Sequence, residues 1–202
     1  MRYGLIGLLL MIGNWVQAAS FQTILVLGDS LSAGYGMKLE QSWVSLLEER
    51  LKEQPFKVVN ASISGETTSG GKSRLPKLLQ QYQPKWVLIA LGANDGLRGL
   101  SLKAMQSNFE QLVQMCQQSQ AIPLLIGMKI PDNYGQRYAE KFSDIYQTVA
   151  QHHQLVLVPF LLEGIALIPQ FFQNDGIHPT AAAQLHLLEN VWRQLQPLLQ
   201  KP

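Results

Sequence analysis

The feature that most constrains the fold is a repeated alternation between short apolar runs and longer segments with apolar residues at helical spacing. The first run, Ile24 to Leu27, contains only large apolar residues, as in a parallel strand covered on both faces. Further strands are predicted at 57–60, 86–91, 123–127 and 155–158, and helices at 43–53, 75–82, 102–118, 138–152 and 180–199. Right-handed crossovers through such helices give a five-stranded parallel sheet between two helical layers, a three-layer α/β/α sandwich.

Residues 1–18 have the layout of a secretory signal peptide rather than of a folded element. Arg2 gives a positive start, Leu5 to Val16 is mostly apolar, and small residues follow at Ala18 and Ala19. The apolar stretch is shorter than the roughly 20 residues that a membrane-spanning helix needs. We therefore expect cleavage near Ala18 or Ala19, the alternative being an uncleaved membrane anchor. Residues 19–202 are then one mature domain, periplasmic or secreted.

Composition narrows the possible partners. The formal net charge of +2 is too small and too dispersed to indicate nucleic acid. Cys116 is the only cysteine, so an exported chain of this kind has no internal disulfide and must be held by packing. We expect Cys116 to be a small buried hydrophobe. We also expect a monomer with no nucleic-acid partner and no stable membrane span once the leader is removed.

Ser30 is a candidate nucleophile because of where it follows the first strand. Gly28 and Asp29 end the apolar run, and Ser30 comes next. Ligands of open α/β sheets bind outside the carboxyl ends of the strands. Gly65 and Asn94 follow the next two predicted strands, so their loops reach the same rim. The alternative is that Asp29 and Ser30 only satisfy backbone donors in a turn and helix start.

A second group of polar residues precedes the closing helix. Asp175 and His178 are three positions apart, so in one turn their side chains can hydrogen-bond. A carboxylate on one ring nitrogen fixes the tautomer and leaves the other nitrogen free to accept a serine proton. The alternative, equally compatible with this motif alone, is that Asp175 caps the helix and His178 is solvated.

Together these residues form the set that acyl transfer requires. Ser30 supplies a nucleophile, His178 a base and Asp175 an orienting carboxylate. The backbone N–H groups of Ser30 and Gly65 and the side-chain amide of Asn94 are candidate oxyanion donors.

This combination resembles the SGNH hydrolases, also called the GDSL lipase and esterase family. The resemblance rests on four blocks in order: Gly28-Asp29-Ser30-Leu31-Ser32, the Gly65 loop, Gly92-Ala93-Asn94-Asp95 and Asp175-Gly176-Ile177-His178-Pro179. It covers essentially the whole mature chain and implies a flavodoxin-like SGNH hydrolase fold. Residues 60–65, 94–99 and 131–138 further resemble a bacterial periplasmic branch with thioesterase, arylesterase and lysophospholipase activities. Asn174 and Ala93 depart from the pattern, where an acid and a glycine are commoner.

The resemblance implies hydrolysis of carboxylic esters and thioesters through an acyl-enzyme on Ser30, without a metal or an organic cofactor. Aryl and acyl esters, acyl-CoA-type thioesters and lysophospholipids are the implied substrates. Two alternatives stay open. One is a carbohydrate O-acyl or acetyl esterase or transferase on the same scaffold, and the other is a noncatalytic envelope binding protein.

Residues that would hold the acyl chain are less well specified. Leu97, Leu100, Ile130, Tyr134 and the apolar segment 160–172 are candidates for the rim, although that segment would equally pack under a long loop. The remaining histidines lie within or at the end of predicted helices and have no accompanying acid block, which favours surface or core roles; they are His152, His153 and His186.

Overall fold

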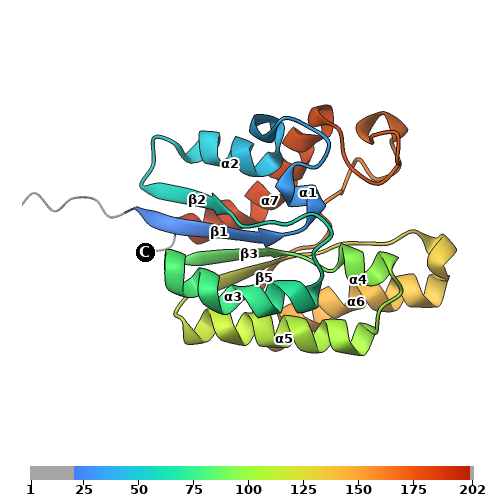
Figure 1. Ribbon diagram of the computed structural model, residues 1–202, viewed down its shortest axis with the longest axis horizontal. Coiled ribbons are helices and arrows are strands. Elements are labelled where there is room, and N and C mark those ends of the chain that lie inside the picture. Colours follow the sequence, from blue (N-terminus) through green and yellow to red (C-terminus); the bar gives the residue numbers. More distant parts are fainter. Residues whose placement is uncertain (1–20, 201–202) are drawn as a thin grey trace, which may run out of the picture.

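The structure, a computed structural model, describes residues 21–200. Its strands form one parallel sheet in the order β2-β1-β3-β4-β5 (Figure 1). The strands are β1 (Gln22–Gly28), β2 (Phe56–Asn60), β3 (Trp86–Ala90), β4 (Ile122–Ile126) and β5 (Val156–Val158). This confirms the predicted five-stranded parallel sheet. The predicted signal peptide, residues 1–18, lies outside the described residues.

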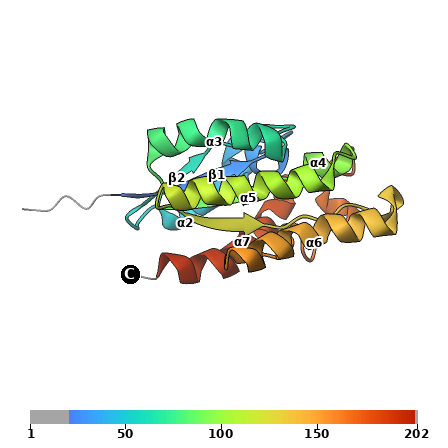
Figure 2. The same ribbon diagram turned by 90° about the horizontal axis from the view of Figure 1, so that it is seen from below.

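Helices cover both faces of the sheet, as predicted. The α-helices are α1 (Ser30–Ala33), α2 (Trp43–Leu51), α3 (Thr68–Tyr82), α4 (Ala93–Leu97), α5 (Leu102–Gln118), α6 (Gln136–His152) and α7 (Gln184–Leu199). Short 3-10 helices are η1 (Leu39–Gln41), η2 (Asp132–Tyr134), η3 (Pro169–Phe171) and η4 (Ala181–Ala183). Helices α2 and α7 pack together on one face, whereas α3, α5 and α6 follow one another on the other (Figures 1 and 2).

The central strands are buried on both faces, which is why their sequences show no polar alternation. Every residue from Ile24 to Leu27 and from Trp86 to Ile89 has 0% exposure. Cys116 is also fully buried, as predicted, and burial raises the pKa of its thiol to about 12. A thiol in this state is inert and acts only in packing.

The helices that differ most from the predictions are α3, α4 and α7. Helix α3 begins at Thr68 rather than at residue 75, because the Thr67 side chain accepts the Gly70 N–H and caps a segment of low helix propensity. Helix α4 occupies a stretch expected to be a loop, since Gly92 reaches φ 104° and lets the chain turn directly from β3 into a helix. Helix α7 begins at Gln184 rather than at Thr180, because η4 precedes it.

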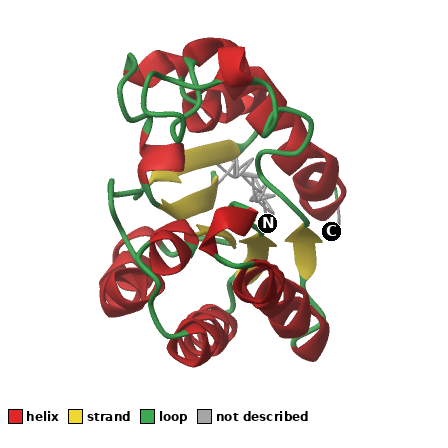
Figure 3. Ribbon diagram, turned by 90° about the vertical axis from the view of Figure 1, so that its right-hand side faces the viewer, coloured by secondary structure: helices red, strands yellow, loops and turns green. Residues whose placement is uncertain are grey.

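The carboxyl ends of the strands lie at one edge of the sheet, which Figure 3 shows facing the viewer. Backbone pairing continues past β2, where the Ile63 N–H donates to the Gly28 carbonyl at 3.0 Å. The loop that carries Gly65 is thereby held beside the end of β1. Within residues 21–200, no helix combines the length and apolarity needed to cross a bilayer.

Candidate active site

Ser30 is held at the end of β1 by a tight strand-to-helix turn. It is the first residue of α1, and the Asp29 carboxylate caps that helix by accepting the Leu31 N–H at 3.0 Å. A Cβ at position 28 would lie 2.8 Å from the Ser32 side chain, so only glycine fits there. Asp29 therefore caps a helix, as the alternative interpretation of the sequence proposed. Ser30 is not used as the cap, and it faces the cavity described below.

His178 and Asp175 lie on a tight loop rather than on a helix. Phe172 and Pro179 pair as an antiparallel bridge, and Gly176 adopts φ 67° within the loop that they close. Asp175 Oδ1 accepts the N–H groups of Ile177 at 2.9 Å and His178 at 3.0 Å. Asp175 is thus not the cap of the closing helix, so that alternative is wrong.

The two loops bring Ser30, His178 and Asp175 into one hydrogen-bonded chain. Asp175 Oδ2 lies 2.7 Å from His178 Nδ1, and His178 Nε2 lies 2.8 Å from Ser30 Oγ. Because an ionised carboxylate only accepts hydrogen bonds, this contact assigns the ring proton to Nδ1 and leaves Nε2 as acceptor for the hydroxyl. The arrangement can therefore deprotonate Ser30 and hold the resulting imidazolium.

The Asp175 charge is secured by its own loop. Hydrogen bonds from the His178 backbone N–H, the His178 ring and the Ile177 N–H lower the pKa of its carboxyl from 3.8 to about 2. The carboxylate is thus ionised at any pH above about 3. It can act on the imidazole throughout the range in which ester hydrolysis is normally measured.

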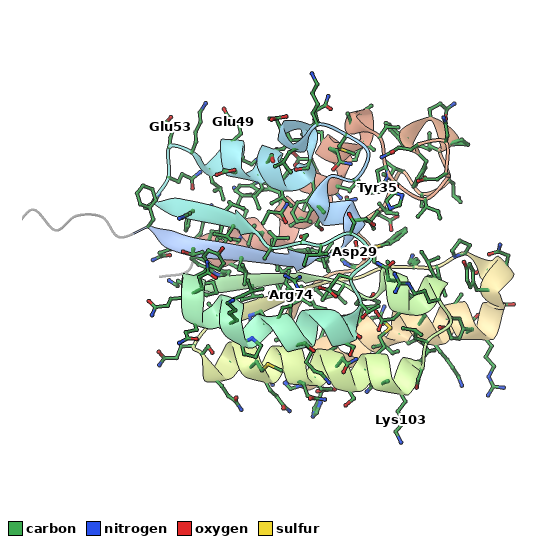
Figure 4. The ribbon with its side chains drawn as sticks, in the orientation of Figure 1. Asp29, Tyr35, Glu49, Glu53, Arg74 and Lys103 are labelled. Atoms are coloured by element: carbon green, nitrogen blue, oxygen red, sulfur yellow. The ribbon has the colours of Figure 1, made fainter. Side chains whose placement is uncertain are left out.

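Tyr35 is a contact of His178 that the sequence analysis missed. Its ring lies 4.4 Å from the imidazole centroid at 37°, and Figure 4 labels it near Asp29. The Tyr35 carbonyl accepts the Gln173 side-chain amide at 2.8 Å, which ties the loop after α1 to the loop of His178. Neither residue belongs to a catalytic motif, so only the flanking Gly34 and Gly36 indicated that a loop lies here.

The candidate oxyanion donors lie at the carboxyl edge of the sheet, on the first turn of α1 for Ser30, in a loop for Gly65 and in α4 for Asn94. Among the described residues, the backbone N–H groups of Ser30 and Gly65 have no acceptor. Gly65 adopts φ 80°, and its carbonyl accepts the Arg98 guanidinium at 2.9 Å, which holds the loop in place. Both N–H groups are available to an external acceptor such as a developing oxyanion.

The Asn94 amide is held in one orientation. Its Nδ2 donates to the Glu66 carbonyl at 3.0 Å and to Asp29 Oδ2 at 3.3 Å, and its Oδ1 accepts from Arg98 at 3.5 Å. The donor and acceptor ends are therefore distinguished by their partners. The NH₂ end lies beside Asp29, the residue before Ser30, whereas the oxygen end is turned to Arg98.

Asn94→Ala is expected to lower kcat by about 10² to 10³ while changing KM much less. The physical reason is that an amide N–H donated to the oxyanion interacts mainly with charge that develops in the transition state. In the resting structure the two Nδ2 protons are donated to Glu66 and Asp29, so one of them must turn to the oxyanion during the reaction. Steady-state hydrolysis of a short-chain p-nitrophenyl ester measures both constants. Asn133→Ala, at an exposed asparagine of η2, is the matched control. A large KM effect at unchanged kcat would instead make Asn94 a contact of the bound substrate.

Asp29 is a buried acid beside this site. Burial raises the pKa of its carboxyl from 3.8 to about 6, against the lowering effects of the Leu31 N–H, the charge of protonated His178 and the Asn94 amide. The folded state thus holds this proton more tightly than the unfolded state does. Between about pH 4 and 6 the Asp29 carboxyl is largely protonated in the folded protein but ionised in the unfolded chain. The contribution of Asp29 to the free energy of unfolding therefore falls as the pH rises from about 4 to 6.

Asp29→Asn is expected to remove this fall in stability with rising pH, because asparagine also caps helices but does not ionise. The contribution amounts to about 2 kcal/mol in the free energy of unfolding between pH 4 and pH 7. Urea unfolding of both proteins at pH 4, 5, 6 and 7 measures it, and the pH slope is compared rather than the absolute stability. An identical slope in the two proteins would show that folding does not raise the pKa of Asp29.

A cavity of about 830 Å³ opens beside Ser30 and His178. Two of the four residues suggested for the acyl chain, Leu97 and Ile130, line it. Leu100 and Tyr134 are exposed and are not among its lining residues, so we do not include them in the acyl site. The Leu100 carbonyl instead accepts the Tyr138 hydroxyl at 3.2 Å.

The apolar segment 160–172 divides between two roles. Leu161 and Ile165 are buried in the core, which matches packing under a long loop. Six further apolar side chains of the segment line the cavity, namely Phe160, Leu162, Ala166, Leu167, Ile168 and Phe172. Leu167 is 95% exposed at this wall. The volume and apolar lining fit a substrate with a hydrocarbon part.

Comparison with known proteins agrees with this geometry. Residues 26–185 match the GDSL-like lipase/acylhydrolase family. The chain is 49% identical over 185 residues to esterase TesA of Pseudomonas aeruginosa, with 91% of this chain and 92% of that protein covered. It is 46% identical over 183 residues to thioesterase 1/protease 1/lysophospholipase L1 of Escherichia coli K12, with 91% and 88% covered.

A solved structure shows the same fold at high similarity. The psychrotrophic esterase EstA from Pseudoalteromonas sp., inhibited by monoethylphosphonate, superimposes with a TM-score of 0.85 at 40% identity, covering 89% of this chain and 100% of that one. The family match spans the four motif blocks from the end of β1 to the loop of His178. The protein therefore belongs to the GDSL-like lipase/acylhydrolase family, as the resemblance of its motifs to the SGNH hydrolases predicted.

Proposed function

We propose that the protein is an exported serine hydrolase that cleaves carboxylic esters and thioesters through an acyl-enzyme on Ser30. The observation that carries the proposal is the chain from Asp175 through His178 to Ser30 Oγ, opening onto the apolar cavity. The names of the relatives, which include an esterase and a thioesterase/lysophospholipase, support the same class of reaction.

The first half of the reaction forms the acyl-enzyme. Ser30 Oγ attacks the substrate carbonyl carbon as its proton passes to His178 Nε2, and Asp175 stabilises the imidazolium. The carbonyl oxygen takes up negative charge and is held by the Ser30 and Gly65 N–H groups and the Asn94 amide. Collapse of this intermediate expels the alcohol or thiol, which receives the proton from His178.

The second half releases the acid. A water molecule gives its proton to His178 Nε2 as its oxygen attacks the acyl carbon, and the same oxyanion donors hold the second tetrahedral intermediate. Ser30 leaves as the hydroxyl and recovers the proton from His178. The free carboxylic acid is the second product. All of these proton transfers use one ring nitrogen, which suits the fixed tautomer.

The proposed substrates are acyl esters and thioesters with an apolar acyl or aryl group. They include aryl esters, acyl-CoA-type thioesters and lysophospholipids. Leu97 and Ile130 would contact the acyl chain inside the cavity, together with side chains of 160–172. The polar headgroup or leaving group would remain at the open side.

A comparison of substrates on one purified sample tests the proposal. Hydrolysis rates are measured for p-nitrophenyl esters, an acyl-CoA and a lysophospholipid, with Ser30→Ala as the blank and Ser107→Ala, at an exposed serine of α5, as the matched control. We expect turnover of at least one class by the parent and control proteins only. Binding without turnover would identify a noncatalytic binding protein, and an acyl product that requires a sugar acceptor would identify a transferase.

Export is tested separately. We propose that residues 1–18 are removed and that the mature protein begins at Ala19 or Ser20 in the periplasm or outside the cell. Intact-mass analysis of protein recovered from the envelope fraction measures the start. Protein that retains residues 1–18 in a membrane pellet would contradict the proposal.

A further inference from the structure

A group of metal-ligating side chains lies at the contact between α5 and α6, and the proposed reaction does not use it. Glu110 comes from α5, His152 is the last residue of α6, and His153 follows it. The two helices lie side by side along one face of the molecule (Figure 2). Sequence analysis gave the two histidines only surface or core roles, because their acid partner is 42 or 43 positions away.

The ligand atoms converge on one point. One ligand atom from each residue lies within 4.8 Å of the other two. His152 Nδ1 is 3.2 Å from Glu110 Oε2, and His153 Nε2 hydrogen-bonds to the same oxygen. The two imidazole rings are 4.8 Å apart. Ligand atoms of a tetrahedral ion are roughly 3.3 Å apart when each bond is about 2.0 Å, so small side-chain rotations suffice to admit one ion.

The three ligand atoms favour a particular class of metal ion. Two neutral imidazole nitrogens and one carboxylate oxygen suit Zn²⁺ and neighbouring divalent transition metals, and a water completes four-coordination. The end of α6 adds to this preference, because the last carbonyls of a helix carry partial negative charge.

Two of the three side chains in the cluster are mostly buried, and the third is exposed. The side chains of Glu110 and His153 are only 20% and 12% exposed, so packing holds two of the ligands in position. His152 is 70% exposed and leaves a route for the ion to enter. A surface pair of one acid and one histidine would have neither the third ligand nor this partial burial.

We propose that Glu110, His152 and His153 form a structural site for a divalent transition-metal ion that joins α5 to α6. The ion replaces the hydrogen bonds between the carboxylate and the two rings with coordinate bonds. The site is separate from Ser30, because α6 crosses back from the carboxyl edge of the sheet to the edge where β5 begins. The ion therefore acts on stability and not on the acyl-transfer chemistry.

Zinc titration of the untagged mature protein tests the site. Isothermal titration calorimetry with ZnCl₂ at pH 7.5 is expected to show one tight equivalent per chain. Glu110→Gln and His153→Gln are each expected to weaken it by more than the roughly 10- to 100-fold that loss of an outer-shell partner costs. His186→Gln, at an exposed histidine of α7 whose ring meets Phe171 edge to face, is the matched control and should bind like the parent.

Thermal unfolding provides a second readout that does not depend on activity. Zinc should raise the unfolding temperature of the parent and of His186→Gln, and should leave those of Glu110→Gln and His153→Gln unchanged. A cooperative transition also verifies that each variant is folded. If a variant fails to fold, the visible absorption of Co²⁺ bound to the parent reports whether imidazole and carboxylate ligands are present. Equal zinc affinity in the parent and folded His153→Gln, or an equal loss in His186→Gln, would overturn the proposal.

Discussion

Ser30→Ala is expected to lower kcat for ester hydrolysis by roughly 10³ to 10⁶ and to leave the protein folded. The substitution removes the oxygen that lies 2.8 Å from His178 Nε2 and leaves the backbone of the capped α1 turn unchanged. The residual rate enhancement comes from the oxyanion donors and from substrate binding, and it is much smaller than that of the enzyme with its nucleophile. Stopped or continuous assays with a p-nitrophenyl ester, with Ser107→Ala as control, measure the loss.

His178→Ala should cost a similar factor, and the double variant should cost little more than either single one. The reason is that the hydroxyl and the imidazole act as one unit, so removal of either abolishes the same proton transfer. Additive losses would indicate that the two residues contribute independently. A folded Ser30→Ala protein with near-normal activity would show that the nucleophile is elsewhere.

Asp175→Asn is expected to lower kcat by about 10⁴. Asparagine keeps the size of the side chain and an oxygen to accept the Ile177 and His178 N–H groups. It places an amide against Nδ1, however, so the ring loses the acceptor that fixes its tautomer. Asp144→Asn, at an exposed acid of α6, is the matched control and should retain full activity.

The pH profile separates orientation from charge in this variant. Asp175 has a pKa of about 2 and is therefore ionised throughout the profile, where its negative charge favours the imidazolium. Activity is lost toward acid because a protonated ring cannot accept the serine proton. Without the Asp175 charge, the midpoint of this acid limb should move to lower pH while the plateau falls. A variant that kept both the parental midpoint and the parental plateau would contradict an orienting role.

The sequence was most informative where one physical requirement dominates. Strands buried on both faces must be apolar throughout, so β1 and β3 could be recognised and their carboxyl ends could be placed at one rim. Ser30 followed from the same rule, because it comes directly after β1 at that rim. His178 was recognised instead from its spacing to Asp175. Their mutual distance could not be predicted, since it depends on the packing of residues 148 positions apart.

Other features depend on contacts that leave no local pattern. The first half of α3 contains Gly70 and Gly71, which disfavour a helix in isolation. Packing favours glycine at position 71, because a Cβ there would lie 2.4 Å from Leu91 Cδ1 and would displace that buried side chain. Tyr35 meets His178 only through the folded loops.

The acyl cavity illustrates the same limit. Leu97 lies on its wall and Leu100 lies outside it, although both are leucines of one short segment. The difference comes from α4, which ends at Leu97 and turns the chain outward before residue 100. Without the helix, the sequence offered no reason to separate the two. The residues of the proposed metal site were missed for a related reason, since α5 and α6 bring them together only after folding.

Covalent labelling of Ser30 is the most direct measurement of the central proposal. The purified protein is treated with an ethyl phosphonate ester that carries a good leaving group, and the adduct is located by peptide mass spectrometry. The proposal predicts one adduct per chain, on Ser30, formed in step with the loss of esterase activity, and no adduct in Ser30→Ala. Complete loss of activity with the adduct on another residue, or full labelling of Ser30 with activity retained, would contradict it.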